Sequence, residues 1–170
     1  EALKIDEWAG KVDEFIDAVM TDTEQMFVKG DPRWPEVTFG PVIHKKALDV
    51  YHRYLNDAMD ARAEIIWPSI ESTGLRRHGT LNKNGYFVEP VIVNNLPTDH
   101  YLFRRELFVP ILRIQPYEGG IEEAVRIAND TEHGLTAGIF TQDEEEKKHF
   151  FDYMNSGVLR TNAEDGATTG

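Results

Sequence analysis

Apolar residues near the start of the chain recur at helical spacing. The positions that form this stripe are Ile5, Trp8, Ala9, Val12, Phe15, Ile16 and Val19. Steps of three and four residues place them on one face of a helix. We therefore predict a helix from Asp6 to about Val28, which the turn Gly30-Asp31-Pro32 ends. A second stripe of the same kind predicts a helix from about Lys45 to Asp60.

The second half of the chain alternates short apolar runs with amphipathic stretches. The predicted strands are Tyr86–Val93, Ile111–Pro116, Leu135–Thr141 and Val158–Thr161, and the predicted helices are Ile121–Asp130 and Asp143–Asn155. Ala63–Trp67 is a further candidate strand, and residues 69–85 are expected to form a loop with room for a minor strand. Strands rich in Val, Ile and Leu that alternate with helices favour a parallel, doubly wound α/β sheet.

This expected sheet predicts where a ligand would bind. In an open parallel sheet, ligands collect at the carboxyl ends of the strands. The loops that follow Thr141 and Thr161 are therefore the candidate functional segments. The second of these loops runs from Asn162 to Gly170 and is rich in small residues.

Length and charge narrow the class of protein. A chain of 170 residues suffices for one domain with a sizeable core. Because it opens on helix-forming sequence and stops in a loop, we expect a single partial domain spanning residues 1–170. A net charge of −12 disfavours nucleic acid and anionic membranes as partners. No apolar stretch approaches the ~18 residues that a membrane helix needs, so the sequence predicts a soluble cytoplasmic protein.

The chain contains no cysteine, which removes several kinds of chemistry at once. Disulfides, thiolate metal sites and a cysteine nucleophile are all excluded within these 170 residues. The six histidines are scattered, and none forms the i, i+4 pair with an acidic partner that is typical of a helical metal site. The sequence therefore predicts no metal site and no cysteine nucleophile of its own.

Glu106 and Phe108 are candidate ligand-binding residues. In an extended run, two residues at this spacing point to the same side of the backbone. The carboxylate could bond a hydroxyl while the aromatic ring packs on a sugar or a base, which suits a ribose with its attached base. The alternative interpretation is a surface Glu106 beside a core Phe108.

Several segments together resemble the aldehyde dehydrogenase superfamily. They occur in the family's order and spacing over nearly the whole chain, from about Lys11 to Gly170. The segments are Gly30-Asp31-Pro32, Gly40-Pro41-Val42-Ile43, Gly85 to Pro90, Glu106-Leu107-Phe108-Val109-Pro110 and Ala128 to Thr141.

The resemblance implies a Rossmann-like α/β catalytic domain and NAD(P)-dependent oxidation of an aldehyde to a carboxylic acid. It implies that Glu106 bonds the hydroxyls of the nicotinamide ribose and that Phe108 lies beside the same ribose. The family's usual Glu-x-Phe-Gly-Pro carries Val109 in place of glycine here, so a different local backbone is expected. NAD or NADP would be the cofactor of the full-length parent.

The segment from Asn162 to Gly170 resembles the aldehyde anchor loop of the 1-pyrroline-5-carboxylate dehydrogenase branch. In that branch two loop amides hold the α-carboxylate of the substrate, glutamate semialdehyde, and the matching residues are Gly166 and Ala167. Asp165 stands where the branch carries threonine, which puts a negative charge near an anionic substrate.

The resemblance also implies which parts of the enzyme this chain lacks. The nucleophilic cysteine, the general base and the nucleotide-binding domain would precede it, and an oligomerisation tail would follow it. We therefore expect the isolated chain to be inactive and the parent to be a homo-oligomer. The alternative hypothesis is a non-catalytic α/β binding or scaffold module that kept the fold without the chemistry.

Overall fold

The computed structural model describes residues 5–68 and 74–163, with side chains from residue 11 onward. The chain divides into two compact units. The first comprises Glu1–Pro97 and Leu107–Pro116, and the second comprises Thr98–Glu106 and Tyr117–Gly170. Each unit is described below by itself. That the two form one domain, as the length of the chain suggests, stays a prediction.

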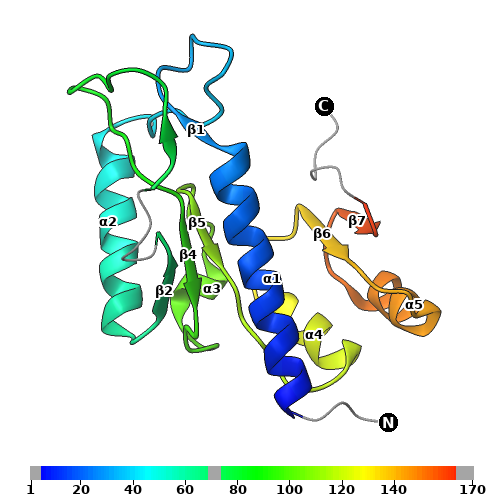
Figure 1. Ribbon diagram of the computed structural model, residues 1–170. Coiled ribbons are helices and arrows are strands. Elements are labelled where there is room, and N and C mark those ends of the chain that lie inside the picture. The colour runs from blue at the N-terminus through cyan, green and yellow to red at the C-terminus, as the bar shows by residue number, and fades with distance from the viewer. Residues whose placement is uncertain (1–4, 69–73, 164–170) are drawn as a thin grey trace. The chain divides into compact units, whose positions relative to one another are not determined.

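The first unit is built around a three-stranded sheet, which Figure 1 shows between two helices. Its elements are α1 (Ile5–Met26), β1 (Val28–Lys29), α2 (Lys45–Asp60), β2 (Glu64–Trp67), β3 (Arg76–Arg77), β4 (Val91–Asn94) and β5 (Ile111–Arg113). The strand order in the sheet is β2-β4-β5, while β1 and β3 form a separate parallel pair. In the sheet β4 is parallel to β5 and antiparallel to β2.

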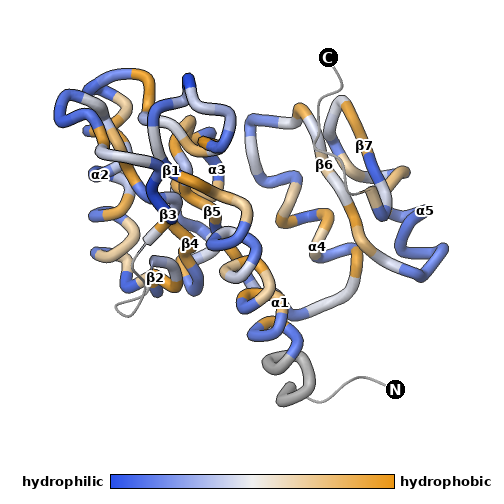
Figure 2. The backbone as a smooth tube through the Cα atoms, turned by 45° about the horizontal axis from the view of Figure 1, so that its top comes forward, coloured by the Kyte–Doolittle hydropathy of each residue, from blue (hydrophilic) through white to orange (hydrophobic). Residues whose placement is uncertain are grey.

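The core of this unit lies where the sheet meets α1. A buried cluster consists of Trp67 of β2, Ile92 of β4 and Leu75, which precedes β3. Val19 and Met20 of α1 pack against this cluster. The indole Nε1 of Trp67 donates a hydrogen bond to Glu24 Oε1 at 3.1 Å, so the buried ring has its polar atom satisfied. Figure 2 shows the matching pattern, with apolar stretches along the central strands and alternating apolar and polar positions along α2.

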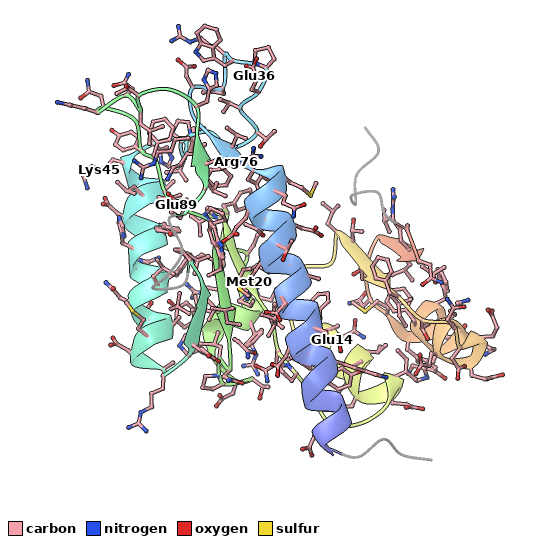
Figure 3. All side chains as sticks on the ribbon, viewed as in Figure 1. Glu14, Met20, Glu36, Lys45, Arg76 and Glu89 are labelled. Carbon is pink, nitrogen blue, oxygen red and sulfur yellow. The ribbon has the colours of Figure 1, made fainter. Side chains whose placement is uncertain are left out.

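An ion pair with a buried lysine joins the residue before Gly30-Asp31-Pro32 to the segment from Gly85 to Pro90 in the first unit. Lys29, at the end of β1, pairs with Glu89, which precedes β4 and is labelled in Figure 3. Glu89 Oε2 also accepts a hydrogen bond from Leu75 N at 3.1 Å, and the hydroxyl of Tyr51 on α2 donates to the Glu89 carbonyl at 2.8 Å. Burial, and after it the charge of Arg77, lower the pKa of the Lys29 ammonium, while burial raises the pKa of Tyr51 to about 12.

The second unit contains a parallel strand pair with its crossover helix. Its elements are α3 (Tyr101–Arg104), α4 (Ile121–Ala128), β6 (Thr136–Ile139), α5 (Glu144–Tyr153) and β7 (Val158–Thr161). The strands β6 and β7 pair in parallel from Thr136↔Val158 to Ile139↔Thr161. The connection through α5 is the kind of crossover that parallel strands require. Asp143 caps α5, because its Oδ1 accepts from Glu145 N at 2.8 Å and Glu146 N at 3.3 Å.

The α/β class with parallel strand pairs is confirmed, but the sheet is not uniformly parallel. Residues 45–60 and 158–161 form the predicted helix and strand, and the strand Tyr86–Val93 shortens to β4. The antiparallel pairing of β2 with β4 was not predicted. Because the described part of their connection contains no helix, the chain can return beside β2 in the opposite direction.

Candidate cofactor and substrate site

Glu106 lies two residues after the end of the one-turn helix α3. His100 Nδ1 caps this helix by accepting from Leu102 N at 3.3 Å, and the helix ends where Arg105 N donates to Tyr101 O at 3.1 Å. Glu106 then leaves the helix with 55% of its side chain exposed. An ionised carboxylate has two oxygens that only accept hydrogen bonds. The residue is therefore available to a ligand that carries hydroxyl donors.

Phe108 has a local geometry that the sequence did not predict. Residues 106–108 form no strand, and Phe108 has a φ angle of 49°. The premise that Glu106 and Phe108 share one side of an extended run is therefore wrong. The alternative of a core Phe108 is also wrong, because the residue is 85% exposed.

The backbone strain of this segment falls on Phe108 rather than on Val109. A left-handed φ angle at a residue with a Cβ atom costs about 1–2 kcal/mol. Because Val109 does not adopt that conformation, valine is compatible with the backbone at the position where the family usually has glycine. Strained residues cluster at ligand sites, and Phe108 combines such strain with an exposed ring.

A loop that follows α4 contacts the segment carrying Glu106. Arg104 Nε and Nη2 lie 3.1 and 2.7 Å from Asp130 Oδ2, and the hydroxyl of Thr131 donates to the Arg104 carbonyl at 3.2 Å. His133 Nδ1 lies 3.9 Å from Glu106 Oε2. The sequence predicted a helix up to Asp130 and a strand from Leu135, and it assigned residues 131–134 between them no role beyond the family signature. An Asn-Asp-Thr turn at a helix end was the one local signal that this loop would be ordered.

The carboxyl ends of β6 and β7 are joined by Asn162, the first residue of the second candidate loop. Its Oδ1 accepts from Thr141 N at 3.0 Å, and its Nδ2 donates to Thr141 O at 2.9 Å. Asn162 has a φ angle of 50°, which asparagine tolerates better than most residues. The two loops predicted from sheet topology thus begin at one bonded pair. Gly166 and Ala167 lie outside the described residues.

The described residues contain neither a metal-ligand cluster nor a membrane-spanning helix. Across residues 5–68 and 74–163, no group of three or more His, Asp or Glu residues is arranged to hold a metal ion. In the same ranges, no helix combines the length and apolar character that crossing a membrane requires.

Comparison with known proteins places the chain in a family. The profile of the aldehyde dehydrogenase family matches residues 9–169. The chain is 30% identical over 149 residues to the chloroplastic betaine aldehyde dehydrogenase of Beta vulgaris, covering 88% of this chain and 28% of that protein. It is 29% identical over 156 residues to the alpha-ketoglutaric semialdehyde dehydrogenase of Bacillus subtilis, covering 92% of this chain and 30% of the relative.

Solved structures agree with this assignment. The chain resembles 3,6-anhydro-L-galactose dehydrogenase in complex with NAP, with a TM-score of 0.78, 27% identity, and coverage of 92% of this chain and 31% of that one. It also shares its fold with a 1-pyrroline-5-carboxylate dehydrogenase from Thermus with bound NAD, with a TM-score of 0.71 and 23% identity, over 90% of this chain and 27% of that one. The chain thus spans about 30% of the length of the curated relatives it matches.

Proposed function

The chain belongs to the aldehyde dehydrogenase family, and from this premise we propose that it forms one part of the cofactor and aldehyde site of an NAD(P)-dependent oxidoreductase. The parent enzyme oxidises an aldehyde to a carboxylic acid. One observation carries the proposal: a family signature segment presents the carboxylate of Glu106 to solvent next to an ordered loop.

Glu106 binds the cofactor through the two hydroxyls of the nicotinamide ribose. A carboxylate that accepts from two vicinal hydroxyls fixes both the position and the orientation of the sugar. Hydrogen bonds to a charged group contribute about 1.5–3 kcal/mol. The exposed ring of Phe108 is available to pack beside the same ribose, as the family resemblance implies.

The oxidation itself needs groups that this chain does not contain. A thiolate attacks the aldehyde carbon, a hydride leaves that carbon, and water then releases the acid from the thioester. A bound nicotinamide would accept the hydride. Because the chain has no cysteine, its own residues bind and orient the reactants, and we propose that the isolated 170-residue chain is inactive. Aldehyde-dependent NADH formation by the purified chain would contradict this proposal.

We propose that the substrate is an aldehyde that also carries a carboxylate, such as glutamate semialdehyde. Support comes from the resemblance of the segment from Asn162 to Gly170 to the anchor loop of the 1-pyrroline-5-carboxylate branch. Asp165 would oppose an anionic substrate, so the bond between the Gly166 and Ala167 amides and the substrate must outweigh that repulsion.

We also propose a cytoplasmic, homo-oligomeric parent. The acidic composition, with a net charge of −12, supports neither nucleic acid nor anionic lipid as a partner. Size-exclusion chromatography with light scattering of the full-length enzyme measures the assembly directly. A monomer at assay concentration would contradict the homo-oligomer.

The cofactor role is tested with Glu106→Gln in the full-length enzyme. We expect the KM for NAD(P) to rise about tenfold, the equivalent of about 1.4 kcal/mol, with a smaller change in the KM for the aldehyde. Glu118→Gln, an exposed glutamate of the same unit, is the matched control. Unchanged cofactor kinetics in Glu106→Gln would refute the ribose contact.

The substrate proposal is tested with Gly166→Ala in the same enzyme. We expect the KM for glutamate semialdehyde to rise more than the KM for a simple aliphatic aldehyde, because only the former presents a carboxylate to the loop amides. Betaine aldehyde and alpha-ketoglutaric semialdehyde complete the panel. Equal changes for charged and uncharged aldehydes would remove the anchor-loop assignment.

A further inference from the structure

Asp130 is bonded to the chain two residues before Glu106, although it lies outside the cofactor contact itself. We propose that Asp130 is a positioning residue for cofactor binding, which acts through Arg104 to hold Glu106 in place for the ribose. This inference rests on the proposed function of Glu106. It assigns a role to an ion pair that would otherwise be an ordinary surface feature.

Three hydrogen bonds hold Arg104, two through its side chain and one through its backbone. The guanidinium contacts Asp130 Oδ2 through both Nε and Nη2, at 3.1 and 2.7 Å. The backbone carbonyl of the same residue accepts from the Thr131 hydroxyl at 3.2 Å. Side chain and backbone of residue 104 are therefore tied to one loop. A single surface ion pair would restrain only a flexible side chain.

The loop that provides these bonds is itself anchored. Asn129 Nδ2 donates to Tyr153 O at 2.9 Å, and Asn129 Oδ1 accepts from Asn155 N at 2.8 Å, which ties the loop to the end of α5. Asn129 N donates to Val125 O at 2.9 Å and Asp130 N to Ile127 O at 3.1 Å, which ties it to α4. Asp130 is thus fixed to two helices.

The same loop reaches the Glu106 side chain. His133 N donates to Thr131 Oγ1 at 3.2 Å, and the His133 ring lies within 3.9 Å of the Glu106 carboxylate. More than half of the Glu106 side chain is exposed, so the carboxylate has few contacts of its own. Its position depends on where α3 and residue 105 place the backbone. Fixing a binding group before the ligand arrives removes part of the entropy that binding must otherwise overcome.

The experiment measures NAD+ affinity in the full-length enzyme that contains this chain. ADP is the second probe, because it lacks the nicotinamide ribose and cannot contact Glu106. We expect Asp130→Asn to weaken NAD+ binding about three- to tenfold and to leave ADP binding unchanged. Arg104 and Asp130 are about half exposed, so the loss of their pair should leave the fold intact.

Two further variants complete the design. Asp152→Asn removes the exposed Lys148–Asp152 pair, which has the same 2.7 Å separation, and should change neither affinity. Thr131→Val removes only the hydroxyl that bonds Arg104 O and should weaken NAD+ binding in the same sense as Asp130→Asn. It provides a second reading if Asp130→Asn lowers Tm.

A double-mutant cycle with Glu106→Gln separates this inference from the proposed function. If Asp130 acts through Glu106, adding Asp130→Asn to Glu106→Gln has no further effect on NAD+ affinity. Additive effects, or an equal loss for NAD+ and ADP in Asp130→Asn, would overturn the positioning role. Normal NAD+ binding in Glu106→Gln alone would instead refute the ribose contact. If Glu106→Gln weakens NAD+ binding while Asp130→Asn and Thr131→Val both bind NAD+ normally, only the positioning role of Asp130 is refuted.

Discussion

The buried pair of Lys29 and Glu89 leads to a sharp prediction about stability. Lys29 is 3% exposed, whereas the Glu89 side chain keeps 22% of its surface. The perturbations are Glu89→Gln, Lys29→Met and the two combined. Each single variant leaves one charge without its partner, while the double variant removes both charges.

The expected magnitudes follow from the burial of each partner. Removing one partner of a buried pair typically destabilises a protein by about 3–5 kcal/mol. Glu89→Gln leaves the ammonium of the more buried Lys29 without its partner, so we expect about 3 kcal/mol. Lys29→Met leaves Glu89, which keeps part of its surface exposed and retains the hydrogen bond from Leu75 N, so we expect about 1–2 kcal/mol. The double variant should lose less than the sum of the singles, about 2 kcal/mol, because no unpaired buried charge remains.

The loss of stability caused by Glu89→Gln should also depend on pH. The pKa of Lys29 in the folded chain lies below its ordinary value of 10.5, because burial and Arg77 disfavour the charge. Between that lowered pKa and 10.5 the unfolded chain binds more protons than the folded chain. Stability therefore rises with pH in this window in wild type and variant alike. Removing the Glu89 charge lowers the pKa of Lys29 further, so the defect of Glu89→Gln should shrink just below this window, where only the folded variant has lost the Lys29 proton.

Amide hydrogen exchange is the most direct assay, because it reads local opening in the full-length enzyme. Leu75 N donates to Glu89 Oε2, and His78 N donates to Lys29 O at 2.9 Å, so both amides report on this cluster. Asp49→Asn, which removes the exposed Lys45–Asp49 pair, is the control and should change protection by less than about 0.5 kcal/mol. Wild-type protection in Glu89→Gln, or strictly additive losses in the double variant, would refute the reasoning.

Three further predictions concern single side chains. Asn162→Ala should lower the free energy of unfolding, measured in urea, by about 1 kcal/mol more than Asn162→Gly does. Both variants lose the bonds to Thr141, but only alanine is strained at a φ of 50°. Equal losses in the two variants would contradict this reasoning. Because burial raises the pKa of Tyr51 to about 12 from 10.0, stability should fall by up to about 2.7 kcal/mol between these two pH values, where only the unfolded chain loses the phenol proton. Tyr51→Phe should flatten that pH profile, and an unchanged slope would show that another group causes it. Phe108→Ala should weaken cofactor binding while changing Tm little, because the ring is exposed; a large drop in Tm with normal binding would reverse the assignment.

Element type was predictable where periodicity extended over several turns or strand residues. The stripe of α2 gave its bounds, Lys45–Asp60, and Asp143 was recognisable as the cap of α5. The two-residue strands β1 and β3 and the four-residue helix α3 are too short for a hydrophobic period to develop. Of these, only β3 was anticipated, as a minor strand within a loop.

The residues of the candidate site were likewise only partly predictable from the sequence. Family resemblance, rather than spacing, selected Glu106, and the extended geometry first used to pair it with Phe108 proved wrong. Asp130 and Arg104 are 26 positions apart in the sequence and meet at 2.7 Å. No local sequence pattern predicts this contact, because it depends on how α4, β6 and α5 fold around the loop between them.

The sequence by itself determined the class of this protein: α/β elements with parallel strand pairs, a chain without its own cysteine nucleophile, and signature segments in the order of one family. These properties follow from residue type and spacing, which act locally along the chain. Only the tertiary structure decided that β2 runs antiparallel to β4, that Phe108 is exposed with a left-handed backbone, and that Asp130 is bonded to the segment of Glu106. The strand pairing and the Asp130 bond depend on contacts between residues distant in sequence, where packing and hydrogen bonding override local preference. The backbone of Phe108 adopts a conformation that its residue type does not favour.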